Sequence, residues 1–402
     1  MMPLPTEWDL TILFDGFDDP RFEQDFARAE KHAAETLAFI STLGHTHGRE
    51  ETVHDLEEVI ARLQALLDPV YRVSAYVSLV LATDATNVRA IACQDRDMLL
   101  HNQVAQVQSA LCRYAGSLEN LQELLSATPA LAEHAFLLLE SARLAAHVLP
   151  PELEPIVLRM QMNGGQAFGN LRYLLDGTHQ VDMVRDGQPV SLPLSTVRGM
   201  AYDPDPAVRK EAYEAELASY KKIEIPMAAC LNAVKGEAQT ICDLRGYTSI
   251  LEETLAGQRL DRATLDVMLT AMEESLPDFR RYLRAKARTL GHPGGLPFYD
   301  LFAPVGKTSR RFTYEESHAY LVGILGRFSE KMAAFVDHAY RNRWIDALPH
   351  AGKGGGAFCA PIPPLKVSRV LCNFDGSFSS VSTIAHELGH AYHGDCLKEG
   401  SL

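Results

Sequence analysis

Two histidines and a glutamate near the end of the chain have the spacing of a metal site. His386 and His390 stand four positions apart, and Glu387 follows the first of them directly. On a helix, residues four apart lie on one face, one turn from each other. Zinc accepts neutral imidazole nitrogens in tetrahedral sites and lowers the pKa of water, which a neighbouring carboxylate can deprotonate. The pattern predicts one zinc ion per chain, held by His386 and His390, with Glu387 as the general base.

A third ligand is harder to find. A catalytic zinc ion normally has three protein ligands. In one known arrangement a third histidine would stand at position 396, which is Cys396 here. His393 can fall near the same face, but an ordinary helix position is the stronger interpretation. A glutamate from a second helix needs more chain than follows His390, so we expect the site to be incomplete.

A structural role is the alternative interpretation of the same residues. Two hydrogen-bonded core histidines could then flank a solvated glutamate. The apolar residues around the motif, such as Val381, Ile384 and Leu388, argue against it. Two imidazoles and a carboxylate are costly to bury on such a helix without a ligand.

The elements around the motif are predicted from local signals. Gly376-Ser377 introduces a final helix from about Phe378. Upstream, 357–360 reads as a strand and 368–373 as its partner. The glycine run 352–356 is predicted to be flexible backbone. It is not a phosphate-binding loop, because that loop needs Ser or Thr directly after its lysine.

Most of the first 175 residues have helical periodicity, which favours an array of helical hairpins. Helix starts are predicted at Asp19-Pro20, at Asp205-Pro206 and at the capping box of Thr313 and Glu316. Alternating residues on either side of Asp186-Gly187 predict a β-hairpin near 179–194. We expect two domains, 1–192 and 193–402.

Composition excludes several classes of function. The chain has 402 residues and a formal net charge of −14. Its share of hydrophobic residues, 47%, is ordinary for a globular protein. No run of Lys or Arg forms the basic patch that nucleic-acid binding requires. The N-terminus lacks the pattern of a secretory leader, and no uncharged apolar stretch reaches about 18 residues. We therefore expect neither a nucleic-acid nor a membrane partner.

The cysteines indicate the compartment. Seven cysteines are scattered along the chain, and none forms a CxxC pair. An odd number at irregular spacing is typical of reduced, mostly buried thiols rather than of a disulfide framework. The prediction is a cytoplasmic protein.

Four longer segments resemble peptidase family M3, and specifically its oligoendopeptidase F branch. They are Gly352–Ile362 (GKGGGAFCAPI), Asn373–His393 (NFDGSFSSVSTIAHELGHAYH), Tyr299–Val305 (YDLFAPV) and Trp344–Asp346 (WID). The second segment is far more specific than the spacing of its histidines alone. The resemblance spans nearly the whole chain and is weaker before residue 110.

This resemblance implies a mainly α, multi-helix, zincin-like fold with a small β-sheet near the active site. Helices would enclose a channel with zinc at its floor, and short unstructured peptides would be the substrates. His386 and His390 would be the zinc ligands and Glu387 the general base. Ala357, Phe358 and Cys359 would form an edge strand whose backbone pairs with the substrate.

The chain departs from the family pattern at its end. Family members extend beyond Leu402, and their third ligand, a glutamate, lies on a later helix. We therefore expect this chain to lack the C-terminal helices and, alone, to be weakly active or inactive. A non-catalytic peptide-binding scaffold and one half of a split peptidase remain alternatives. Exposed apolar surface would favour association with a C-terminal fragment or with another copy.

Overall fold

The computed structural model describes residues 3–44, 48–185, 187–306, 310–350 and 352–398. They form two compact units, the first from Met1–Pro151 with Ser309–Leu402 and the second from Glu152–Thr308. The predicted domains divide the chain differently, because position 192 lies in a β-hairpin inside the second unit. The two parts of the first unit meet through contacts that are remote in sequence. The Ala347 amide donates to the Thr6 carbonyl over 2.8 Å, for example.

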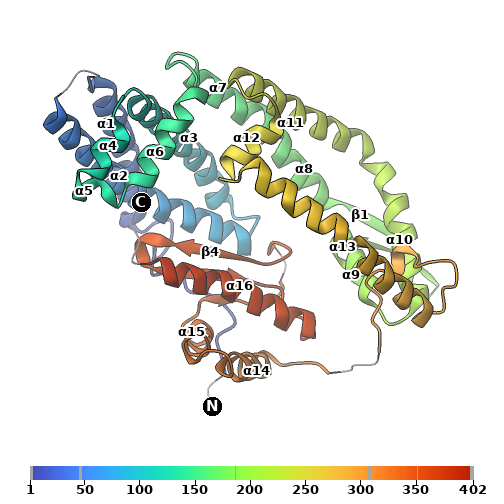
Figure 1. Ribbon diagram of the computed structural model, residues 1–402. Coiled ribbons are helices and arrows are strands. Elements are labelled where there is room, and N and C mark those ends of the chain that lie inside the picture. Colours follow the sequence, from blue (N-terminus) through green and yellow to red (C-terminus); the bar gives the residue numbers. More distant parts are fainter. Residues whose placement is uncertain (1–2, 45–47, 186, 307–309, 351, 399–402) are drawn as a thin grey trace. The chain divides into compact units, whose positions relative to one another are not determined.

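The first unit is mainly helical, with one small sheet (Figure 1). Its elements are α1 (Pro20–Thr42), α2 (Arg49–Thr83), α3 (Val88–Gly116), α4 (Leu121–Ser126), α5 (Pro129–Ala132), α6 (Ala135–Leu144), η1 (Ala145–His147), α14 (Tyr314–Gly326), α15 (Glu330–Arg341), β3 (Ile345–Asp346), β4 (Phe358–Ile362), η6 (Pro363–Leu365), β5 (Val367–Leu371) and α16 (Phe378–Leu397). The helical character predicted for most of the first 175 residues is confirmed.

Helices α1, α2 and α3 pack against one another around the larger core of this unit. Helix α1 begins as predicted, with Pro20 as its first residue and the Asp19 carboxylate accepting from the Arg21 amide over 2.9 Å. Helix α2 is the one helix of the described residues that is long and apolar enough to cross a bilayer. Its residues Leu56 and Leu66 are fully buried, so its apolar side belongs to the core of the unit.

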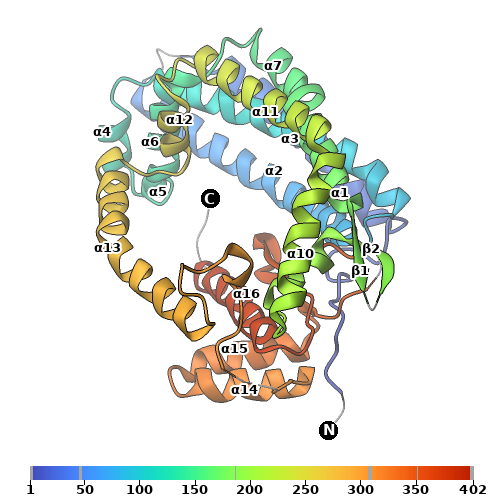
Figure 2. The same ribbon diagram turned by 90° about the vertical axis from the view of Figure 1, so that its right-hand side faces the viewer.

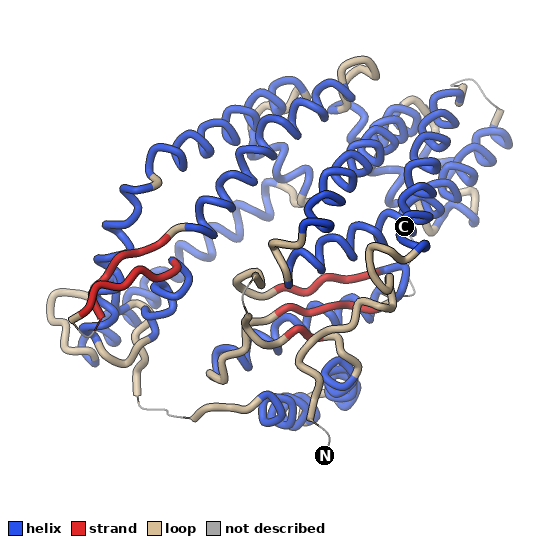
Figure 3. The backbone as a smooth tube through the Cα atoms, turned by 180° about the vertical axis from the view of Figure 1, so that it is seen from behind, coloured by secondary structure: helices blue, strands red, loops and turns tan. Residues whose placement is uncertain are grey.

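The sheet of the first unit has the strand order β3-β5-β4 (Figure 3). Strand β3 is parallel to β5, and β4 is antiparallel to it. The two predicted strands are therefore confirmed as a pair, although β4 continues to Ile362 and β5 ends at Leu371. Side chains alternate between the two faces. Ile362 and Leu371 join the core that contains α2, whereas Val370 and Cys372 join the core that contains α16.

Helix α16 carries the motif and begins as predicted. The Ser377 side chain accepts from the Ser380 amide over 3.1 Å and caps the helix. Its buried face consists of residues at helical spacing that pack on the sheet and on α14 and α15: Val381, Ile384, Leu388 and Ala391. His386 and His390 lie on the exposed face. The predicted capping box of Thr313 and Glu316 opens α14.

The second unit is a helical layer with one hairpin (Figure 2). Its elements are α7 (Glu154–Gln161), η2 (Met162–Gln166), α8 (Ala167–Thr178), β1 (Gln180–Arg185), β2 (Gln188–Pro193), α9 (Leu194–Gly199), η3 (Met200–Tyr202), α10 (Pro206–Ser219), η4 (Tyr220–Lys222), α11 (Glu224–Leu244), α12 (Ile250–Gly257), α13 (Arg262–Thr289) and η5 (Phe298–Asp300). The predicted hairpin is confirmed in its two antiparallel strands, while Asp186 lies outside the described residues. Asp205 caps α10 as predicted.

Candidate active site

The two motif histidines converge on the exposed face of α16. Their Nε2 atoms lie 3.2 Å apart, and the ring centroids are 4.8 Å apart with the rings nearly perpendicular. The separation is that of two ligands on one ion. Two nitrogens each about 2.05 Å from zinc, at a tetrahedral angle, are about 3.3 Å apart. The spacing of the two nitrogens is therefore that of two ligands of one zinc ion.

The described residues bring no third ligand to this pair. Among them, no group of three or more His, Cys, Asp or Glu side chains is placed to hold a metal ion. His393 lies one turn further along α16, but it does not complete such a group, and Cys396 is exposed. The geometry thus supports a two-imidazole site in the part of the chain that the structure describes.

Glu387 lies beside the histidines but points into the protein. The residue is only 8% exposed, whereas both histidines are exposed. Within the described residues, no hydrogen-bond donor or cation pairs with its carboxylate. A buried carboxylate without a partner is costly unless it has a task or a ligand. Its position suits a base that acts on a molecule in the adjacent cavity.

Two thiols lie near this carboxylate. Burial raises the pKa of the Cys359 thiol to about 11 and that of the Cys372 thiol to about 12. The negative charge of Glu387 acts in the same direction on both groups. In the part of the chain that the structure describes, neither thiol belongs to a group of three side chains placed to hold a metal ion.

A cavity of about 650 Å³ connects the motif with the sheet inside the first unit. Glu387 and His390 line it from α16, and Trp344 lines it from the start of β3. On the opposite side it is lined by the three residues predicted to bind substrate: Ala357, Phe358 and Cys359. The structure therefore brings those three residues, Glu387 and His390 to one cavity.

Among the described residues, β4 pairs with β5 only, so its other edge is unpaired. The amides of Val370 and Cys372 donate to the Trp344 and Asp346 carbonyls on the β3 side, over 2.9 Å and 2.8 Å. Along a strand the backbone groups of alternate residues point to opposite sides, so Arg369 and Leu371 face β4. Their partners are Ala360 and Phe358.

It follows that the intervening residue of β4, Cys359, turns its N–H and C=O away from the sheet. Pro361 lies on the same side and has no N–H to donate, as is usual for proline on an edge strand. Ala357 directly precedes the strand, and by the same alternation its backbone groups point to the side of Cys359. Of the three residues predicted to bind substrate, Cys359 offers both a donor and an acceptor, and Phe358 is used within the sheet.

Sequence reasoning missed three residues of this region. Pro361 and Trp344 line the cavity. A proline within a predicted strand indicates an edge strand, and this signal could have identified Pro361. Lys353 was considered only as part of an excluded phosphate loop. Its side chain is in fact fully buried and paired with Asp346 over 2.6 Å, a contact that no local pattern indicates.

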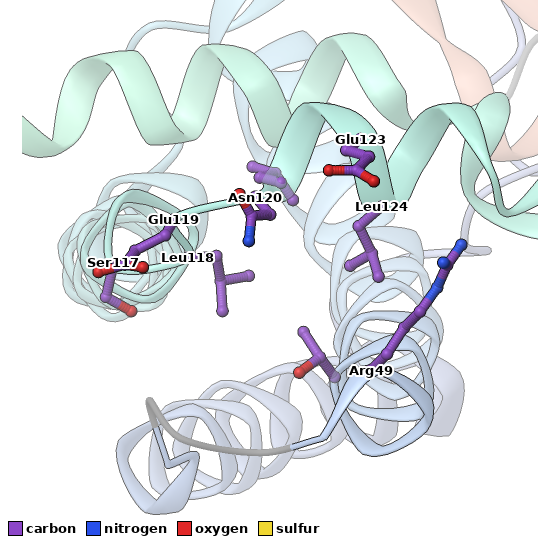
Figure 4. Close-up of a pocket in the computed structure, with 9 residues that line it drawn as sticks. Arg49, Ser117, Leu118, Glu119, Asn120, Glu123 and Leu124 are labelled. Atoms are coloured by element: carbon purple, nitrogen blue, oxygen red, sulfur yellow. The ribbon is translucent and has the colours of Figure 1, made fainter.

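A second cavity of the first unit, of about 470 Å³, lies between the start of α2 and the connection from α3 to α4 (Figure 4). Arg49 lines it together with Glu119 and Glu123. Its lining contains neither His nor Cys. Of the motif residues, Glu387 and His390 line the cavity at α16, and none lines this second cavity.

Comparison with known proteins places the chain in a family. The profile described as Peptidase family M3 matches residues 199–398. The group B oligopeptidase PepB of Streptococcus agalactiae is 23% identical over 401 residues, which is 98% of this chain and 64% of that protein. An oligoendopeptidase F homologue of Lactococcus lactis is 27% identical over 192 residues, 48% of this chain and 32% of that protein.

Solved structures share the fold. PZ peptidase A matches with a TM-score of 0.70 at 14% identity, over 96% of this chain and 64% of that one. Oligoendopeptidase F from Enterococcus faecium matches with a TM-score of 0.58 at 16% identity, over 80% and 66%. The chain spans less than two thirds of the length of the two relatives named above. The profile match, the relatives and the shared helical fold agree with the predicted resemblance: this chain belongs to peptidase family M3 and is similar to its oligoendopeptidase F members.

Proposed function

We propose that this chain carries the zinc-binding and catalytic helix of an oligopeptidase, a metalloendopeptidase that hydrolyses short peptides. The observation that supports this most is the 3.2 Å separation of the His386 and His390 Nε2 atoms, which matches the spacing of two zinc ligands. Family membership supports the reaction class. In this proposal the two imidazoles hold one Zn²⁺, and Glu387 is the general base.

Zinc bound there would supply Lewis acidity, polarising a peptide carbonyl and making water more acidic. The chain's own contribution is proton transfer. Glu387 is buried against the cavity, so its carboxylate can take a proton from the attacking water and later return it to the leaving amine.

Substrate binding would use the free edge of β4. An extended peptide can pair with the N–H and C=O of Cys359 and with Ala357, a form of β-augmentation. Only a chain without folded structure can present its backbone in this way, which favours short unstructured peptides. Phe358 and Trp344 would contribute apolar contacts to its side chains.

Activity of this chain alone is expected to be low. Two imidazoles hold zinc more weakly than a site with three protein ligands, and the described residues supply only the pair. A third ligand from a C-terminal fragment or from another chain would convert the site into an active one. The seven free cysteines support a reducing compartment such as the cytoplasm.

Cleavage of an internally quenched fluorescent peptide tests this function. We expect at most weak zinc-dependent cleavage by the chain, abolished in Glu387→Ala. Glu316→Ala is the control, because it removes a carboxylate from the cap of α14. Activity that appears only after a C-terminal fragment is added would identify a split peptidase. Peptide binding without zinc and without cleavage would identify a scaffold and contradict the proposal.

A further inference from the structure

Lys353 is a buried charge in the middle of a glycine run. Its side chain is 0% exposed, although it stands between Gly352 and Gly354. The ammonium group donates to the Asp346 carboxylate over 2.6 Å, to the Asp346 carbonyl over 3.1 Å and to the Leu348 carbonyl over 2.8 Å. All three of its protons are therefore used, as a buried ammonium requires.

The rest of the glycine run is fixed just as closely. The Asn373 side-chain amide, just beyond β5, donates to the carbonyls of Gly354 and Gly356, each over 3.0 Å. The Gly354 amide donates to the Ala82 carbonyl of α2 over 2.8 Å. The prediction of free flexible backbone for 352–356 is therefore wrong, because contacts remote in sequence hold it.

Glycine is favoured where this run turns. Gly352 and Gly356 both have φ of +83°, a conformation that other residues rarely adopt. Such a run costs much conformational entropy to order. The buried ion pair and the Asn373 bridge offset this cost.

The ordered glycine run leads directly into β4, which lines the cavity. Gly356 directly precedes Ala357, and two residues later the chain reaches Cys359, which lines the cavity and whose N–H and C=O point away from β5. Any movement of the glycine run is transmitted to this edge, because β4 begins at Phe358. Asp346 belongs to β3, on the opposite side of the sheet from β4. Lys353 therefore ties the entry of the edge strand to the far side of its own sheet.

We propose that Lys353 is a positioning residue, held by Asp346, that fixes the peptide-binding edge of β4 relative to Glu387 and His390. Its role in peptide affinity rests on the function proposed above. Its role in ordering the strand does not, and can be measured without any substrate. Lys353 itself is not among the residues that line the cavity.

The test must separate positioning from ordinary stability. Lys353→Met leaves Asp346 buried and unpaired, so it lowers stability for a trivial reason. The double variant Lys353→Met/Asp346→Leu removes both charges, which is often neutral for stability. If the pair only stabilises the fold, the double variant restores both the stability and the order of β4. If Lys353 positions the strand, stability returns while the order of β4 does not.

Hydrogen exchange of the Phe358 and Ala360 amides, which bond to β5, reports that order directly. We expect exchange about 10-fold faster or more in both variants than in the wild type. Arg72→Met is the matched control, because it breaks a partly buried pair with Asp25 over 2.9 Å between α1 and α2. It should lower stability without changing exchange at the two amides.

Peptide affinity is measured in the full chain with Glu387→Gln, so that no turnover occurs. We expect the dissociation constant to rise about 10-fold in the double variant, with zinc stoichiometry unchanged. Unchanged exchange at Phe358 and Ala360 in the double variant would overturn the positioning role. Faster exchange with no peptide binding even by the Glu387→Gln parent would instead support the positioning role and contradict the proposed function.

Discussion

The Val370 amide donates to the Trp344 carbonyl over 2.9 Å, and this bond decides which backbone groups of the neighbouring strand are free. It turns Val370 toward β3, so the adjacent residues Arg369 and Leu371 face β4. On β4, Phe358 and Ala360 then bond within the sheet, and Cys359 is left to pair with another chain. Pro361 ends this free edge, because it has no N–H to offer.

Pro361→Ala should lengthen the binding edge by one donor. We expect tighter binding of peptides long enough to reach position 361 and little change for shorter ones, because only the longer ones gain a hydrogen bond. The same free donor should increase self-association of the chain, since open edges pair with one another.

Titration calorimetry with peptides of increasing length and light scattering measure the two effects. Pro363→Ala is the control, because Pro363 lines the same cavity from η6 but lies outside the strand. Equal effects of the two substitutions would show that β4 does not bind peptides through its edge.

The cap of α16 should contribute to stability and not to chemistry. Ser377→Ala removes the bond to the Ser380 amide and is expected to cost about 1 kcal/mol in the free energy of unfolding. Chemical denaturation measures this loss. Ser377→Asp, which retains an acceptor at the cap, should recover most of it, and a failure to recover would mean that the hydroxyl acts in another way.

Thiol labelling should follow the local pKa values. Burial raises the pKa of Cys359 to about 11 from the ordinary value of 9.0, so the group stays a protonated thiol up to pH 9 and ionises only as the pH rises toward 11. Because the thiolate is the reactive form, alkylation of Cys359 at pH 8 should be far slower than that of the exposed Cys396.

Mass spectrometry of partly alkylated protein gives the two rates. Unfolding in denaturant should abolish the difference, because both thiols then have ordinary pKa values. Equally fast labelling of both cysteines in the folded chain would show that Cys359 is not shielded as the structure has it.

The helix and strand that carry the site could be predicted because their signals are local. Ser377 caps α16, and apolar residues recur at helical spacing to Ala391, so the convergence of His386 and His390 follows from periodicity alone. The remaining predicted site residues, Ala357, Phe358 and Cys359, came from the family resemblance. What local signals could not give is the partner of each element across the chain.

Lys353 illustrates that limit. Neighbouring glycines indicate mobility, yet Asp346 and the Ala82 carbonyl hold the segment from other elements. The division into two compact units likewise depends on contacts that are remote in sequence. Residues 1–151 join 309–402 through tertiary contacts such as that between Trp8 and Phe358, whose ring centroids are 6.4 Å apart. No composition change near residue 192 or elsewhere reports such a contact.

The metal content of purified protein tests the central claim most directly. Inductively coupled plasma mass spectrometry after exposure to one equivalent of Zn²⁺ and gel filtration compares wild type, Glu387→Gln and His386→Ala/His390→Ala. The structure predicts comparable zinc in the first two proteins and none in the third, because the imidazoles are the ligands and the carboxylate is the base. Equal zinc in all three, or its loss in Glu387→Gln alone, would contradict this assignment.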